Sequence, residues 1–105
     1  MRNKPAAVIV AYLLLSAAAV WSQDATELLN KGLESSSANV KIAYFTNALK
    51  LNPNLAKAYE QRAIHYYFQE RFDKAIADYT KLVELTPRNA AAYQMRGMAH
   101  MKNGD

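Results

Sequence analysis

An internal repeat constrains this chain of 105 residues more than any other feature of its sequence. When the sequence is shifted by 34 positions against itself, identical residues coincide along two segments, and one unbroken offset over both is hard to obtain by chance. The coinciding pairs are Ile42 and Ile76, Ala43 and Ala77, Thr46 and Thr80, Leu51 and Leu85, Pro53 and Pro87, Ala56 and Ala90, Ala58 and Ala92, Tyr59 and Tyr93, and Arg62 and Arg96. A repeat of this length is one supersecondary unit that buries its apolar side against its neighbours. We therefore expect a stack of similar units.

Within each repeat the apolar residues follow a helical spacing. Residues 56–68 contain no Gly or Pro, and residues 72–85 place apolar side chains on one stripe with a period of about 3.6 residues. Only residues 69–71 separate these segments, which predicts an antiparallel helical hairpin. Pro53 and Pro87 end the repeats, because proline lacks the N–H donor and clashes with the preceding turn. The pattern predicts helices at about 24–34, 39–51, 55–68, 72–86 and 89–102, and it predicts no strands.

Matching positions of the repeats carry small, aromatic and proline residues. They are Tyr59, Arg62 and Ala63; the run from Phe72 to Thr80 (FDKAIADYT); Pro87; Tyr93, Arg96 and Gly97; and, earlier, Phe45, Ala48 and Pro53. Small residues lie where two helices must cross closely, and aromatic residues fill the space between neighbouring hairpins. Over about residues 25–105 the chain resembles a tetratricopeptide-repeat (TPR) protein. The resemblance implies an all-α fold, a right-handed superhelical array of antiparallel helical hairpins.

The repeat pattern divides the chain into four parts. They are a signal peptide at 1–22, a degenerate first repeat at 23–54, a second repeat at 55–89, and the first helix of a truncated third repeat at 90–105. About two and a half repeats are therefore expected, whereas a solenoid needs roughly three, with polar caps at its ends. The interpretation as a fragment of a longer protein is favoured, and a homodimer through the open last helix is the alternative.

Three departures from the repeat pattern predict local structure. Lys41 stands where the second repeat has Ala75, and residues 35–37 are serines where apolar helix residues are expected. We interpret the serines as a polar turn and both changes as the degeneration typical of a terminal repeat. Glu70 stands where the next turn has Gly104, so the turn before residue 72 is expected to avoid a left-handed residue.

Residues 1–22 predict an export signal. Arg2 and Lys4 give a positive start, and an uncharged run from Ala6 to Trp21 follows. This run is short for a membrane-spanning helix, which needs roughly 20 apolar residues. We expect cleavage after Ser22 or Ala19. The alternative is that this segment stays uncleaved, and it is then the only part of the chain expected to contact a membrane. The mature protein is predicted to be exported, periplasmic or secreted, and the absence of an N-x-[ST] glycosylation sequence favours a bacterial periplasm.

The composition excludes several classes of chemistry. The chain has no cysteine, so it has no disulfide framework, thiol nucleophile or thiolate metal site. Its three glycines are isolated and form no phosphate-binding loop, and His65 and His100 do not form a ligand-spaced pair. Glu70, Asp73 and Asp78 are interpreted as solvated ion-pair residues. We therefore predict no enzyme activity, no catalytic residues, no metal and no cofactor.

The charge of the expected mature chain argues against nucleic acid as a partner. From Gln23 onward the chain has 11 Lys and Arg and nine Asp and Glu, so its net charge is +2. This charge is too small and too evenly spread along the sequence to bind the phosphate backbone of a nucleic acid.

Recognition of a protein remains. The resemblance implies that the first helix of each hairpin lines a concave groove for peptides. The predicted groove residues are Lys57, Glu60, Gln61, Ile64, Tyr67, Phe68, Gln94, Met95 and Met98. Tyr67 and Phe68 are expected to dominate binding, whereas Met101 is expected to pack against further repeats. We predict a scaffold for a protein or peptide segment, and the alternative is an accessory module of a longer exported enzyme or envelope transport or assembly component.

Overall fold

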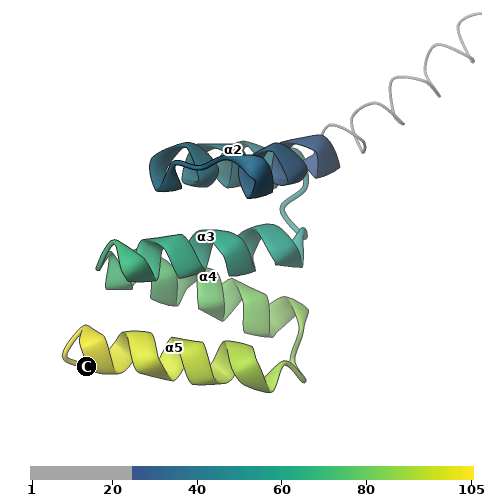
Figure 1. Cartoon of the computed structure of the whole chain (residues 1–105). Helices are drawn as coiled ribbons and strands as arrows, with labels where there is room; N and C mark the ends of the chain where they lie inside the picture. Colours follow the sequence, from purple (N-terminus) through teal and green to yellow (C-terminus); the bar gives the residue numbers. More distant parts are fainter. Residues whose placement is uncertain (1–24) are drawn as a thin grey trace, which may run out of the picture.

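The computed structural model describes residues 25–105, and all regular structure in this range is helical (Figure 1). Residues 25–34 form a helix, and four more follow: α2 (Ala38–Leu51), α3 (Ala56–Phe68), α4 (Phe72–Leu85) and α5 (Ala90–Lys102). The bounds of α2 to α5 lie within one residue of the expected positions. The predicted signal peptide at residues 1–22 lies outside the described residues.

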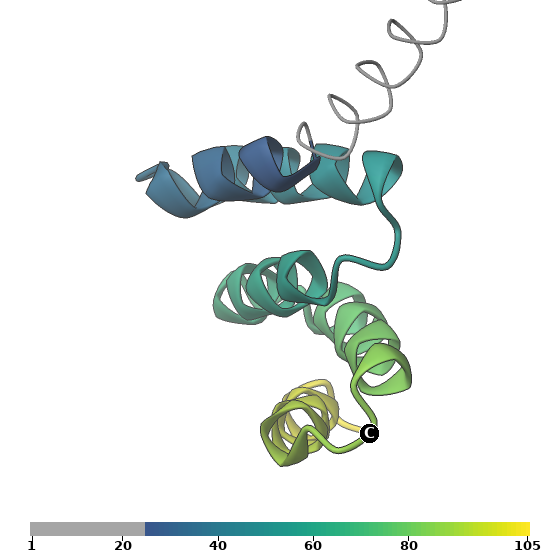
Figure 2. The same ribbon diagram turned by 90° about the vertical axis from the view of Figure 1, so that its right-hand side faces the viewer.

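The helices stack in the order of the sequence. α2 packs on α3, α3 on α4, and α4 on α5. Figure 2 shows α3 and α5 on the same side of the stack, with α4 on the other side. Short turns join antiparallel neighbours, as the spacing of the apolar segments predicted. The predicted all-α array of helical hairpins is confirmed.

Small residues let the paired helices cross closely. Ala63 and Ala75 are fully buried, and so are the large side chains of Phe45 and Tyr79. At Gly32, a Cβ atom would lie 2.5 Å from a ring carbon of Phe45. Since carbon atoms normally approach no closer than about 3.5 Å, α2 has its present position against the first helix only because residue 32 has no side chain.

A buried ion pair joins three helices. Arg62 of α3 donates from Nε and Nη2 to the two carboxylate oxygens of Asp78 on α4, at 2.8 and 2.7 Å, and from Nη1 to the hydroxyl of Thr46 on α2. The prediction that Asp78 is solvated was wrong, because its side chain is buried. Burial raises the pKa of Asp78, and the hydrogen bonds from Arg62 oppose that rise. The same hydrogen bonds raise the pKa of Arg62.

The departures of the first repeat have a local explanation. The ammonium group of Lys41 donates to the carbonyl oxygens of Gly32 and Leu33, at 3.1 and 3.0 Å, where the first helix ends. A cation at this end satisfies carbonyls that have no partner within the helix. Residues 35–37 form the predicted turn, and Ser37 caps α2 by accepting a hydrogen bond from the N–H of Val40.

The turns after α3 and α5 have the same geometry. The N–H of Arg71 donates to the carbonyl of Tyr66, and one repeat later the N–H of Asp105 donates to the carbonyl of His100. Such a helix end needs a left-handed residue just before the closing donor. Gly104 has φ +84°, and Glu70 has φ +60°, so the expectation that Glu70 avoids this region was wrong.

Glu70→Gly is expected to raise the free energy of unfolding by about 1 kcal/mol, because a residue with a Cβ atom is strained in the left-handed region. Glu70→Ala keeps the Cβ atom and removes only the exposed carboxylate, so it is the matched control and should bring no such gain. Urea denaturation of both variants measures the difference. Equal stability of the two variants would contradict the strain at residue 70.

Tyr79 generates a prediction about alkaline pH. Within residues 25–105 its buried hydroxyl has no hydrogen-bond partner, and burial, followed by nearby acidic groups, raises its pKa to about 12. An unfolded tyrosine titrates near 10. The folded state therefore holds the hydroxyl proton of Tyr79 more tightly than the unfolded state does. The contribution of this proton to the free energy of unfolding is full below pH 10 and is lost as the pH rises from about 10 to 12.

Tyr79→Phe removes the buried hydroxyl, so it should raise the free energy of unfolding at pH 7 by about 1 kcal/mol and reduce the loss of stability above pH 10. Tyr93→Phe, at an exposed ring, is the control that should change neither. Denaturation curves between pH 7 and pH 12 test both effects. If the free energy of unfolding falls equally above pH 10 in the parent protein and in Tyr79→Phe, the pKa of Tyr79 is not raised by folding.

Candidate functional site

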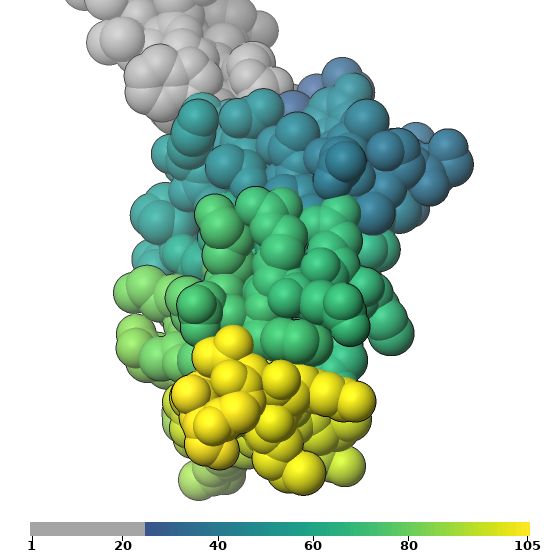
Figure 3. All heavy atoms as spheres, turned by 90° about the vertical axis from the view of Figure 1, so that its left-hand side faces the viewer, coloured from purple at the N-terminus to yellow at the C-terminus, as the bar shows by residue number. Residues whose placement is uncertain are grey.

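The structure brings together part of the predicted groove. Tyr67 on α3 and Met98 on α5 line one surface hollow of about 320 Å³ with Met101 and Lys102. Met101, which was expected to pack against repeats that this sequence lacks, is 77% exposed within the described residues. Figure 3 shows the C-terminal ends of α3 and α5 next to each other on the molecular surface.

Lys57 and Glu60 lie at the other end of α3. They line a separate, smaller hollow of about 170 Å³, and the Nζ of Lys57 pairs with a carboxylate oxygen of Glu60 at 3.1 Å. Leu82 of α4 and Thr86, the residue directly after α4, line the same hollow. The predicted groove residues are thus divided between two places along α3.

The remaining predicted residues line neither hollow. Gln61 and Ile64 are half-buried on α3, Gln94 is exposed on α5, and Met95 packs against the core. Met95, a predicted groove residue, is half-buried on the side of α5 that faces the core. Periodicity alone does not separate two neighbouring stripes of one helix when both carry methionine.

Phe68 and Tyr67 differ in their surroundings. The ring of Phe68 is 75% exposed, whereas Tyr67 is half-buried. The Tyr67 ring lies edge-on to Phe68, with centroids 5.7 Å apart, and edge-on to Phe72 of α4 at 5.4 Å. Tyr67 therefore supports the packing of α3 on α4 and supplies a wall of the hollow, while Phe68 is free to contact a ligand.

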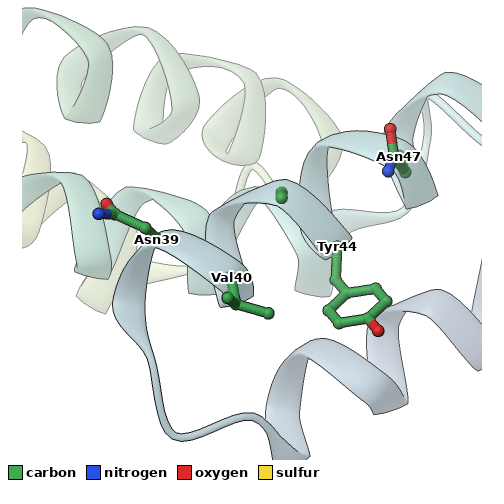
Figure 4. A pocket seen from close by; sticks show the side chains of 5 residues that line it. Asn39, Val40, Tyr44 and Asn47 are labelled. Carbon is green, nitrogen blue, oxygen red and sulfur yellow. The ribbon is translucent and has the colours of Figure 1, made fainter.

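A hollow on α2 was missed by the sequence analysis. It encloses about 380 Å³ and is lined by Asn39, Val40, Ala43, Tyr44 and Asn47. Figure 4 shows Val40 and Tyr44 on one side of α2, with Asn39 and Asn47 toward the ends. The spacing of these residues on a helical wheel would have revealed the stripe. All five belong to α2, and one of them, Tyr44, lies against Gly32 of the first helix.

The acidic and basic residues around the turn between α3 and α4 pair with neighbours. The cationic groups of Arg62, Arg71 and Lys74 lie 5.7, 4.8 and 5.8 Å from the centroid of the Tyr66 ring. Asp73 accepts a hydrogen bond from the side-chain amide of Asn103 at 2.8 Å, which ties the end of α5 to the start of α4. These contacts have a structural role.

The histidines lie on different helices and have different surroundings. His65 stacks on Phe45 with centroids 6.3 Å apart, and burial, together with the charge of Lys41, lowers its pKa. The Nδ1 of His100 lies 2.9 Å from a carboxylate oxygen of Asp105, and this hydrogen bond lowers the pKa of Asp105. Within residues 25–105, no three His, Asp or Glu side chains gather as metal ligands would.

Comparison with known proteins identifies the repeat. The family model described as the TPR repeat matches residues 65–104, from the second half of α3 to the turn after α5. Residues 65–104 therefore contain a tetratricopeptide repeat. A search of curated proteins finds no match. The matched segment contains Tyr67, Phe68, Met98 and Met101, and the presence of the repeat supports a protein–protein interaction module in general.

No helix among residues 25–105 has the length and apolar character that a membrane crossing requires.

Proposed function

We propose that this protein is a non-enzymatic scaffold that binds a peptide or protein segment on the α3–α5 surface. This surface consists of Tyr67, Phe68, Met98, Met101 and Lys102. The observation that supports the proposal is the exposure of two large apolar side chains, 75% for Phe68 and 77% for Met101, beside a hollow that both helices line. Clustered exposed apolar side chains mark interaction sites.

The chemistry of the α3–α5 surface suits an apolar segment. Aromatic rings are the residues that most often dominate binding energies, and methionine side chains adapt to irregular partners. Lys102 lies at the edge of the hollow and places one cation beside the apolar side chains. The ligand expected here has an apolar side chain for the hollow and an acidic group near it.

The other predicted groove residues extend this surface along α3 and α5. Gln61, Ile64 and Gln94 offer amide and apolar contacts to a longer ligand, and the Lys57–Glu60 pair lies at the far end. Since exposed ion pairs contribute little energy, we assign the main contribution to Phe68 and its neighbours.

Phe68→Ala is expected to weaken binding of a peptide selected on this protein from a random library by about 30-fold. Truncation of a dominant aromatic side chain costs about 2 kcal/mol, and each 1.4 kcal/mol is a factor of ten. Phe68 is a better choice than Tyr67, whose truncation also removes a packing contact with Phe72. Lys74→Ala, at an exposed residue of α4, is the control and should leave affinity unchanged.

Titration of the selected peptide by calorimetry measures these affinities at equal fold stability. Full affinity in Phe68→Ala, together with a loss in Lys74→Ala, would place the binding site on α4 instead.

We further propose that residues 1–22 direct export and that the mature protein is periplasmic or secreted. The positive start and the uncharged run before Gln23 support this proposal. Mass spectrometry of the protein from its source is expected to find a mature chain that starts at Gln23 or Val20. An intact Met1 on protein recovered from the cytosol would exclude export.

A further inference from the structure

One side of α5 exposes residues whose counterparts on α3 are buried. Tyr93 is 43% exposed, whereas Tyr59, its counterpart one repeat earlier, is 8% exposed. Gly97 is exposed, whereas Ala63 is fully buried. We call the side of α5 that carries Tyr93, Arg96 and Gly97 the outer face. In Figure 2, α4 lies on one side of α5, and no described helix lies beyond it.

The two hairpins of the structure show what covers such a face. In the first, the ring of Phe45 on α2 lies against Gly32. In the second, Tyr79 of α4, the counterpart of Phe45 in the next repeat, lies in one buried cluster with Tyr59 and Ala63. An aromatic side chain of a second helix thus packs near a small residue of the first. At Gly97, no atom lies within 4 Å of the place where a Cβ atom would stand.

Charge gives a second, independent requirement. Arg62 of α3 pairs with Asp78, the residue directly before Tyr79. Its counterpart Arg96 forms no ion pair within residues 25–105, and its guanidinium lies 5.4 Å from the centroid of the Tyr93 ring. A helix that fills this face in the way α4 covers α3 therefore supplies two adjacent residues, a carboxylate for Arg96 and an aromatic ring for Gly97.

We propose that the outer face of α5 binds an amphipathic helix of a partner protein, and that this helix carries an acidic residue directly followed by an aromatic residue. A second copy of this chain fits less well. α5 (AAAYQMRGMAHMK) contains no acidic residue, so two outer faces in contact would place Arg96 opposite Arg96 and leave both guanidinium groups without a carboxylate. The proposed site adjoins the α3–α5 surface at Met101 but does not depend on the function proposed for that surface.

The probe is a fluorescent, capped peptide with the sequence of residues 71–88, which contains α4 and its Asp78–Tyr79 pair. Fluorescence anisotropy with the full chain is expected to show saturable binding. Gly97→Leu should weaken that binding at least tenfold, because the leucine side chain occupies the place of the tyrosine ring. Gly97→Ala should keep it, since the counterpart of Gly97 on α3 is Ala63, which lies in one buried cluster with Tyr79. Both substitutions replace a helical glycine by a better helix former, so neither is expected to unfold the protein.

Arg96→Gln and the peptide with Asn in place of Asp78 test the ion pair. Each is expected to weaken binding at least tenfold, and their combination should cost little more than either alone, because the two changes remove the same contact.

Four results would overturn the proposal. The first is the absence of saturable binding up to about 1 mM peptide, a Kd that corresponds to a binding free energy of only about 4 kcal/mol. The second is equal affinity of the peptide for Gly97→Leu and Gly97→Ala. The third is docking of the same helix only when it is fused after Asp105, and the fourth is a dimer of the chain that Gly97→Leu abolishes. A peptide that loses affinity in Phe68→Ala but not in Gly97→Leu binds on the α3–α5 surface, which would support the proposed function and exclude the outer face as its site.

Discussion

The close crossing of two helices at a small residue is the constraint on which the rest of this fold depends. At Gly32 the ring of Phe45 lies where a side chain would begin, and the second hairpin has Ala63 and Tyr79 in the same buried cluster. Since a single repeat unit cannot bury an aromatic residue alone, each crossing requires the next helix of the stack. The repeat length, the short turns and the alternation of small and aromatic residues all bring an aromatic side chain of one helix against a small residue of another.

The ion pair of Arg62 adds specificity to that crossing. A buried ion pair is weak evidence for stability, because removing two charges from water costs about as much as their attraction returns. Its geometry is nevertheless demanding, since the guanidinium must meet both carboxylate oxygens of Asp78 and the hydroxyl of Thr46 at the same time. The pair therefore fixes the register of α3 against α2 and α4, which apolar contacts alone would leave less well defined.

Most of the fold could be predicted from the sequence, and less of the site. The helices follow from periodicity and from Pro53 and Pro87, which act locally. The backbone conformation of Glu70 was predicted wrongly because the closing hydrogen bond of the turn requires a left-handed residue there, whatever the residue type. The surroundings of Asp78 were predicted wrongly because a sequence gives the stripe of a residue but not the neighbour that covers it. The hollow on α2 contains no motif, so only its helical spacing could have indicated it.

α5 presents two different surfaces because neighbouring residues of a helix point about 100° apart. Tyr93, Arg96 and Gly97 follow a spacing of three and four residues and share the outer face, whereas Met98 lies on the side of the hollow shared with α3. Met101, four residues after Gly97, lies between the two and also lines the hollow. A helix bound at the outer face would leave Met98 accessible but would contact Met101, whose counterpart Tyr67 packs on Phe72 of α4. The two surfaces therefore meet at Met101, and α5 would join them as α3 joins its neighbours on either side.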